Sequence, residues 1–202
     1  MKKTITKILT TILIFSLFIP FTVQAGGVQS QYAYVMQIGS KDMTIQKDQK
    51  EPKTVSLLYP IVLDKESGRS GIAIEIFEGW GGVSIPTIRV VSHDTYADTR
   101  QDLYTLSHTN VPKSGIITEF KLLFPDGIAW IEKSKEDDYS NIIEEAEIPV
   151  PFIPYMVDIE ESPGRVVIAP FRIIFENLHH KVDWNPDTQE ITVTYPAPET
   201  EE

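Results

Sequence analysis

A single helical stripe in a chain of otherwise strand-like segments is the feature that most constrains the fold. After Pro170, apolar side chains recur at the helical spacing i, i+3, i+4 and i+7, at Phe171, Ile174, Phe175 and Leu178. Proline is accepted in the first helical turn, where its missing amide donor is not needed. The pattern therefore predicts one amphipathic helix that begins next to Pro170.

Two β-hairpins are predicted toward the two ends of the chain. In residues 32–45 the apolar residues alternate on both sides of an interruption at Gly39-Ser40-Lys41-Asp42. In residues 182–195 they alternate on both sides of Asn185-Pro186-Asp187. Trp184, in the second hairpin, is expected to be buried against the helix, so that its truncation to alanine would cost about 3 to 5 kcal/mol.

The middle of the chain is predicted to be β-rich with long polar connections. Period-two alternation predicts strands at 54–63, 72–77, 83–91, 116–124 and 128–131. Composition predicts loops at 46–53, 65–71 and 92–110, a solvated charged connection at 133–138 and a short helix at 140–145. The expected fold class is therefore α+β, a small and mainly antiparallel sheet packed on one helix, with an additional β-rich inserted region.

The N-terminal segment 1–25 has the charged, apolar and cleavable layout of a secretory signal peptide. Three lysines precede an apolar run from Ile8 to Phe21, and Val23-Gln24-Ala25 supplies small side chains at the cleavage positions. The run has 14 residues, whereas a helix that spans a bilayer needs about 20. Cleavage after Ala25 is expected, with a secreted or cell-wall-associated product and no retained membrane span; a retained anchor is the alternative.

Charge and composition exclude several classes of partner. The chain has 18 basic and 29 acidic residues, and removal of residues 1–25 would leave 15 − 29 = −14. Nucleic acid is excluded as a partner, because phosphate binding depends on clustered lysine and arginine. The absence of cysteine excludes disulfides and thiolate zinc sites. Residues 196–202 are expected to form an acidic tail.

A family resemblance lies in residues 149–195. The segment Gly164-Arg165-Val166-Val167-Ile168-Ala169-Pro170-Phe171-Arg172, followed by Glu176, Leu178, Val182 and Trp184, resembles the copper amine oxidase N-terminal-like domain, whose members typically carry G-R-T-x-V-P-L-R, E-x-L-G and V-x-W-D. Residues 34–45 are similar to the opening hairpin of that family. Two departures are an extra residue between Gly164 and Pro170 and His179 where the family has glycine, which adopts left-handed geometry more easily.

The resemblance implies a noncatalytic stalk module without copper or any other cofactor, of a kind found in exported proteins of Gram-positive bacteria. It divides the chain into a discontinuous domain, 32–63 plus 148–195, and a β-rich insertion, 64–147. The residues that carry the motif are interpreted as fold determinants rather than as a reaction centre: Gly164, Arg165, Pro170, Arg172, Glu176, Leu178, Val182 and Trp184. Arg172 and Glu176 are spaced for an i, i+4 ion pair.

A metal site at His179-His180 and Asp183 is weighed and set aside. Imidazole and carboxylate are metal ligands, but adjacent residues point apart on a helix or a strand and rarely share one ion. A role at the helix end is favoured, with His180 or Lys181 near the terminal carbonyls. His93 and His108 are expected to be isolated loop residues.

An enzymatic activity is not expected. Glu75 with Glu78, or Asp137 with Asp138, could supply the carboxylate pair of a glycoside hydrolase, but such pairs are common in a chain with 29 acids. No G-x-S-x-G motif is present.

Trp80, within Gly79-Trp80-Gly81-Gly82, is the candidate ligand contact, because an exposed indole can stack on a sugar or dock in a partner. Burial of Trp80 in the core is nevertheless the favoured interpretation, and ligand contact is the alternative. The expected function is an exported noncatalytic module for binding or assembly at the bacterial cell envelope, with a cell-wall polymer or a protein as partner. The alternatives are a wall-active hydrolase and an accessory subunit of a secreted complex.

Overall fold

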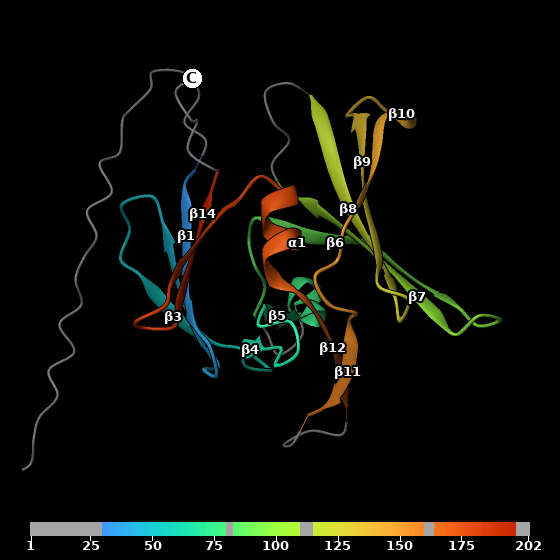
Figure 1. Ribbon diagram of the computed structural model, residues 1–202. Coiled ribbons are helices and arrows are strands. Elements are labelled where there is room, and N and C mark those ends of the chain that lie inside the picture. The colour runs from blue at the N-terminus through green and yellow to red at the C-terminus, as the bar shows by residue number, and fades with distance from the viewer. Residues whose placement is uncertain (1–29, 80–82, 110–114, 160–163, 197–202) are drawn as a thin grey trace, which may run out of the picture.

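The computed structural model describes residues 30–79, 83–109, 115–159 and 164–196, and these form three antiparallel sheets around one short helix (Figure 1). The predicted signal peptide, Trp80 and residues 197–202 of the predicted tail lie outside the described residues. Strands make up 58% of the described residues and helical turns 8%. The expected α+β class is therefore wrong, and the fold is β-rich.

The terminal sheet joins the two ends of the chain. Its order is β13 (Lys181–Asn185), β14 (Glu190–Tyr195), β1 (Tyr32–Gln37), β2 (Asp42–Lys47) and β3 (Lys53–Ser56). Both predicted hairpins are confirmed, and β1 lies between them, with Tyr34 opposite Val193 on one side and Ile45 on the other. The sheet therefore depends on pairing between residues about 160 positions apart in the sequence.

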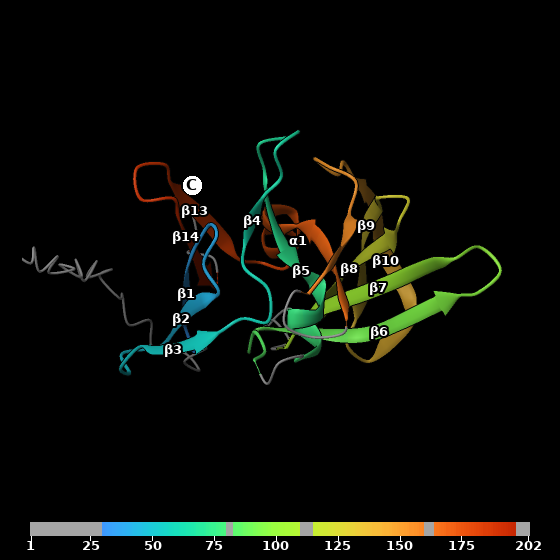
Figure 2. The same ribbon diagram turned by 90° about the horizontal axis from the view of Figure 1, so that it is seen from below.

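The meander sheet is built from consecutive strands. Its order is β10 (Asp138–Ile148), β9 (Ile128–Lys135), β8 (Ile116–Phe124), β7 (Gln101–His108) and β6 (Ile88–Tyr96). Figure 2 shows β6 and β7 extending away from the helix. The predicted strands at 116–124 and 128–131 are confirmed. The predicted loop at 92–110 and helix at 140–145 are wrong, because β6, β7 and β10 fill these segments.

The small sheet lies between the other two in sequence. Its order is β11 (Tyr155–Asp158), β12 (Arg165–Pro170), β5 (Ser70–Ala73) and β4 (Val62–Leu63). It pairs a segment close to the first predicted domain boundary with one from the C-terminal part of the chain. The division into a discontinuous domain and an insertion stays a prediction.

The helix α1 (Phe171–Asn177) begins after Pro170, as the stripe predicts. The side chains of Phe171, Ile174, Phe175 and Leu178 are fully buried. The helix contacts β13, β5 and β8, which belong to three different sheets, and lies between the terminal and meander sheets in both views (Figures 1 and 2). A helix of seven residues therefore supplies the centre of the main core.

Trp184 does not have the predicted position. Its side chain is 41% exposed, whereas Val182, two residues earlier on the same face of β13, is buried. Trp184 lies next to the turn at the end of an edge strand, beyond the part of the face that the short helix covers. The expected cost of truncating Trp184 is accordingly too large.

The predicted strand at 72–77 ends at Ala73, and a 3-10 helix, η1 (Ile74–Glu78), follows. Glu75 compensates for the lost backbone pairing, because its Oε1 accepts a hydrogen bond of 2.8 Å from the Val167 amide of β12. Gly79 ends the turn at a φ of 78°, in the left-handed region that suits glycine. The alternation of apolar residues therefore corresponds to a strand only up to Ala73. Beyond it, the side chain of Glu75 forms the hydrogen bond to β12 that a further strand residue would have made.

Candidate functional site

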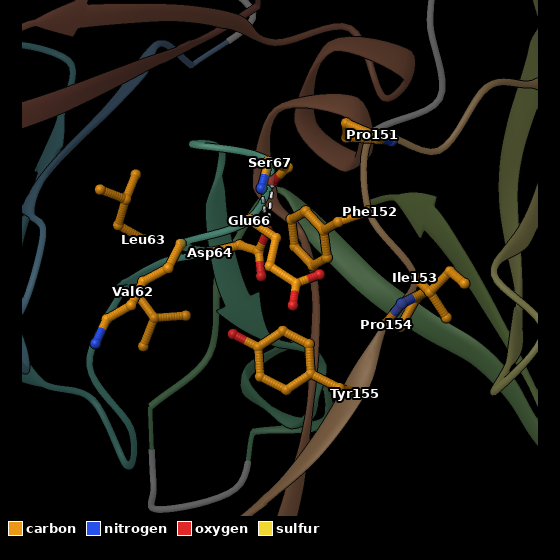
Figure 3. Close-up of a pocket in the computed structure, with 11 residues that line it drawn as sticks. Val62, Leu63, Asp64, Glu66, Ser67, Pro151, Phe152, Ile153, Pro154 and Tyr155 are labelled. Atoms are coloured by element: carbon orange, nitrogen blue, oxygen red, sulfur yellow. Dashed lines mark hydrogen bonds between the residues drawn. The ribbon is translucent and has the colours of Figure 1, made fainter.

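An open groove of about 910 Å³ lies between the chain around β4 and the segment that precedes β11 (Figure 3). Residues 62–67 form one wall and residues 151–155 the other. The volume is within the usual range for small-ligand and peptide-side-chain sites. Because the two walls come from distant parts of the sequence, the small sheet creates this site by pairing β4 with β5 and β12 with β11.

Some of the side chains that line the groove pack against one face of the small sheet. Along β12, Val167 and Ala169 belong to the main core, whereas Val166 and Ile168 belong to a second apolar cluster. This second cluster also contains Ala73 and is covered by partly buried side chains that include Val62, Phe152 and Tyr155. The sheet is therefore buried on both faces, and the groove lies among the side chains that cover the second face.

Gly71 lets Phe152 approach the sheet. A Cβ at Gly71 would lie 2.6 Å from Cγ2 of Ile168 and 3.2 Å from Cζ of Phe152. The first of these distances is too short for carbon atoms, so a larger residue at this position would push Ile168 of β12 and the ring of Phe152 away. Glycine at this position keeps the ring of Phe152 against the sheet.

Two aromatic rings and two exposed aliphatic side chains are among the apolar groups that line the groove. The rings of Phe152 and Tyr155 are 6.1 Å apart between centroids and tilted by 48°. Ile153 is 68% exposed and Leu63 is 48% exposed, both unusually open for their type. Burial, together with the nearby Asp64 and Tyr59, raises the pKa of Tyr155, so its phenol keeps its proton at neutral pH.

The two carboxylates of the groove differ in their partners. Oδ2 of Asp64 accepts hydrogen bonds from the Ser67 amide at 2.7 Å and from the Ser67 hydroxyl at 2.6 Å, and these bonds lower the Asp64 pKa. Glu66 has no side-chain hydrogen bond or ion pair within the described part of the chain. Figure 3 shows the Glu66 carboxylate pointing toward Phe152 and Tyr155. Asp64 therefore holds the turn, and Glu66 remains as the anionic group available to a ligand.

The structure separates the histidines that suggested a metal. Nδ1 of His180 lies 2.6 Å from the Leu178 carbonyl and Nε2 lies 2.8 Å from Oγ1 of Thr87. Nε2 of His179 lies 3.1 Å from Oγ1 of Thr118, and Asp183 pairs with Lys181 at 2.9 Å. The contact of His180 with a terminal helix carbonyl agrees with the favoured interpretation. Among the described residues, no group of three or more histidine and acidic side chains could hold a metal ion.

His93 and His108 are strand residues, not the isolated loop residues that the sequence suggested. His93 lies on β6, its Nδ1 is 3.1 Å from Oε1 of Glu78, and its ring stacks on Tyr104 at 4.2 Å. His108 is buried at the end of β7, 5.6 Å from the ring of His179. Sequence spacing could not reveal these contacts, because each joins elements that are separate in the sequence: β6 with η1, β6 with β7, or β7 with the turn after α1.

The proposed carboxylate pairs have structural or exposed positions. Glu75 is buried and its Oε1 completes the β12 ladder, whereas Glu78 bonds to His93. Burial raises the pKa of Glu75 to about 7. Asp137 and Asp138 lie exposed at the turn between β9 and β10. Neither pair lines the groove.

The residues of the family motif make structural contacts. Nε of Arg165 lies 2.9 Å from Oδ1 of Asp158 across the β11–β12 pair. Arg172 pairs with Glu176 at 2.7 Å, as the spacing predicts, and also donates to the Val182 carbonyl at 3.0 Å. The Gly164 carbonyl accepts a bond of 3.0 Å from the Ile159 amide. Pro170 precedes α1 and Leu178 follows it.

Sequence reasoning missed the groove. The best available signal was Pro151-Phe152-Ile153-Pro154, in which two prolines hold apolar side chains in an extended segment next to a predicted strand. Its counterpart, Asp64 to Ser67, is indistinguishable from an ordinary polar turn in the sequence. Trp80, the residue chosen as the ligand contact, lies outside the described residues.

Comparisons of the chain with protein-family models, with curated proteins and with solved structures found no match. Within the described residues, no helix has both the length and the apolar character needed to cross a bilayer.

Proposed function

We propose that this protein is an exported, noncatalytic binding module of the bacterial cell envelope, and that its groove binds a basic side chain of a protein partner. The observation that carries the proposal is the Glu66 carboxylate, which faces two aromatic rings and has no partner among the described side chains. A cation between aromatic faces and a carboxylate is attracted by both. The apolar stem of lysine or arginine also fits the apolar walls.

Charge favours a protein partner over an anionic wall polymer. The chain carries a formal net charge of −11, so polymers rich in phosphate would be repelled unless a cation bridged them. A basic protein segment would be attracted by the same field. Binding to such a segment is also compatible with an accessory subunit of a secreted complex.

Export and the lack of catalysis have support from the sequence and from the site. Residues 1–25 have the layout of a signal peptide, and the motif from Gly164 to Trp184 resembles the noncatalytic copper amine oxidase N-terminal-like domain. Within the groove, Asp64 is engaged by Ser67, which leaves one free carboxylate, Glu66, where a glycosidase needs two.

The test uses the mature chain and two blocked peptides, one that alternates arginine with leucine and one with glutamate in place of arginine. Calorimetric titration at moderate salt should detect the arginine peptide only. Glu66→Gln and Phe152→Ala should each weaken binding about fivefold, the equivalent of about 1 kcal/mol. Glu51→Gln, an exposed acid in the β2–β3 connection, is the matched control and should bind as wild type. Equal affinities of Glu66→Gln and wild type would refute the groove as the site.

A further inference from the structure

Strand β10 is the longest strand of the described chain and forms one edge of the meander sheet (Figure 1). It pairs with β9 along one side, and no described strand lies on its other side. An unpaired edge presents a row of amide and carbonyl groups that can accept another strand. The other edge strands of the three sheets are shorter, β4 having only two residues and β3 and β11 four each.

Both faces of β10 are uncovered near its start. Residues 138–145 are all exposed, including Tyr139 at 53%, Ile142 at 48% and Ile143 at 52%. Eight consecutive residues are exposed, so neither face of this part of the strand is packed. Exposed apolar residues on a long edge strand mark an interaction surface or an aggregation hazard.

The charge of β10 distinguishes between these two outcomes. The strand carries Asp138, Glu144, Glu145 and Glu147 and no basic residue. Glu144 pairs with Lys133 of β9 at 2.9 Å, whereas Glu145 and Glu147 have no such partner among the described residues. A second copy would bring like charges together, which opposes self-association. A strand with basic residues would be attracted instead.

We propose that β10 is a docking strand for an extended segment of a partner protein in which lysine or arginine alternates with apolar residues. The partner adds a sixth strand to the meander sheet through backbone hydrogen bonds. Its basic residues lie opposite Glu145 and Glu147, which are two apart and share one face of β10. The surface is separate from the groove and does not depend on the function proposed for it.

The regular part of the ladder defines where the added strand would pair best. From Glu144 to Ile148, β10 keeps an unbroken register with β9, from Lys133 to Ala129. Between Asp138 and Glu144 the register shifts twice. Bulges bend a strand and interrupt pairing, so the partner should pair first with residues 144–148 and contact Ile142 and Ile143 at its end.

The test uses a blocked peptide of alternating lysine and valine with a fluorescent label, and the full mature chain. Binding is measured by anisotropy, and backbone pairing by amide hydrogen exchange of β10 with and without peptide. We expect exchange of alternate amides in residues 144–148 to slow on binding. A peptide of the same composition with the lysines and valines in separate blocks should bind at least tenfold more weakly.

Charge reversal supplies the decisive variants. Glu145→Lys/Glu147→Lys should weaken binding of the alternating peptide at least tenfold, whereas Glu51→Lys/Asp187→Lys, with the same change in net charge on exposed turns, should not. Glu66→Gln should leave the slowed amide exchange of residues 144–148 unchanged, because that protection reports on β10 alone, and this separates failure here from failure of the groove. Equal affinities of the two double variants, or binding without amide protection in β10, would overturn the proposal, as would a concentration-dependent dimer that protects the same amides.

Discussion

Glu75 and His180 are both buried ionisable side chains, yet burial moves their pKa values in opposite directions. Burial raises the pKa of Glu75 to about 7 and lowers that of His180 to about 3. In both cases the interior disfavours the charged form, which is the anion of an acid and the cation of a base. Desolvation therefore affects each pKa more strongly than the hydrogen bonds of the group do, including the bond from the Val167 amide that favours ionised Glu75.

The side chains of His180 and Glu75 also differ in how many of their polar atoms have hydrogen-bond partners. The carbonyl of Leu178 can only accept, so Nδ1 of His180 carries the proton and Nε2 accepts from the Thr87 hydroxyl. Thr87 Oγ1 then accepts from the hydroxyl of Tyr34 at 2.9 Å. Oε2 of Glu75, by contrast, has no hydrogen-bond partner among the described residues. Both ring nitrogens of His180 are therefore hydrogen-bonded, whereas one carboxylate oxygen of Glu75 is not.

Opposite pKa shifts give opposite dependences of stability on pH. His180 is protonated in the unfolded chain below its ordinary pKa of 6.5, so the stability it supplies is lost as the pH falls from 6.5 toward 3. Glu75 ionises in the unfolded chain above 4.5 but in the folded chain only near 7, so its contribution is lost as the pH rises from 4.5 to 7. Between pH 4.5 and 6.5 the two effects oppose each other.

Replacement of His180 is expected to change the pH dependence of stability more than any other substitution considered below. His180→Gln should remove the acid limb that His180 causes, that is, its share of the stability lost on acidification, which for one site with this pKa difference amounts to about 5 kcal/mol between pH 6.5 and 3. Urea unfolding at a series of pH values measures it. If the variant does not fold, the ring protons of wild-type His180 provide a second measurement by NMR. A midpoint near 6 for those protons would contradict the burial argument.

Truncation of Phe175 tests whether ring packing excludes water from His180. The centroid of the Phe175 ring lies 5.3 Å from that of His180, 4.6 Å from that of Phe171 and 5.8 Å from that of Phe77 of η1, so the ring packs between His180 and η1. Phe175→Ala should cost about 3 to 5 kcal/mol of unfolding free energy. It should also raise the pKa of His180, because water can enter the cavity. Ile173→Ala, on the half-buried side of α1, is the control and should cost less.

Glu75→Gln should flatten the other side of the curve. Its amide oxygen can still accept from Val167, but the charge is gone, so the decline of about 3 kcal/mol between pH 4.5 and 7 should disappear. Glu78 and Tyr104, which face Glu75, remain unchanged in this variant. Chemical unfolding at both ends of that pH range measures the difference, and Glu51→Gln should keep the wild-type decline. An unaltered slope in Glu75→Gln would show that another group causes it.

The smallest effect is expected at the neighbour of His180. His179 is exposed, has a φ of 61° and bonds to Thr118. His179→Gly relieves the left-handed conformation but loses the bond, so stability should change by less than about 1 kcal/mol. The acid limb should stay. If it vanished in His179→Gly, the loss of stability in acid would come from His179, whose pKa is also lowered by burial, and not from His180.

The spacing of apolar residues in the sequence correctly predicted the helix and the strands that bury one face. Phe171 to Leu178 predicted α1, and the alternation around Asn185 predicted the β13–β14 hairpin. The segment 138–148 has no such pattern, because an exposed edge strand has no buried face to impose one. Its strand conformation comes from pairing with β9, which a single segment of sequence does not encode.

The groove could not be predicted from the sequence for a related reason: it is assembled from segments that are far apart along the chain. The groove needs Glu66 from one turn and Phe152 from a proline-bounded segment, and only the order of the small sheet brings these two parts of the chain together. Glu75 shows the same limit at one residue, since its alternation with Ile74 and Ile76 predicted a strand. The structure instead uses its side chain in place of the next strand residue.

The position of β1 between β2 and β14 sets an order on folding. A chain that emerges from the ribosome N-terminus first presents β1 long before β14 exists, whereas β6 to β10 can pair with their neighbours as soon as each is made. The meander sheet can therefore form early, and the terminal sheet can close only when residues 190–195 arrive. Until then β1 exposes an open flank, so a chain truncated before β14 should be soluble only with help from a chaperone.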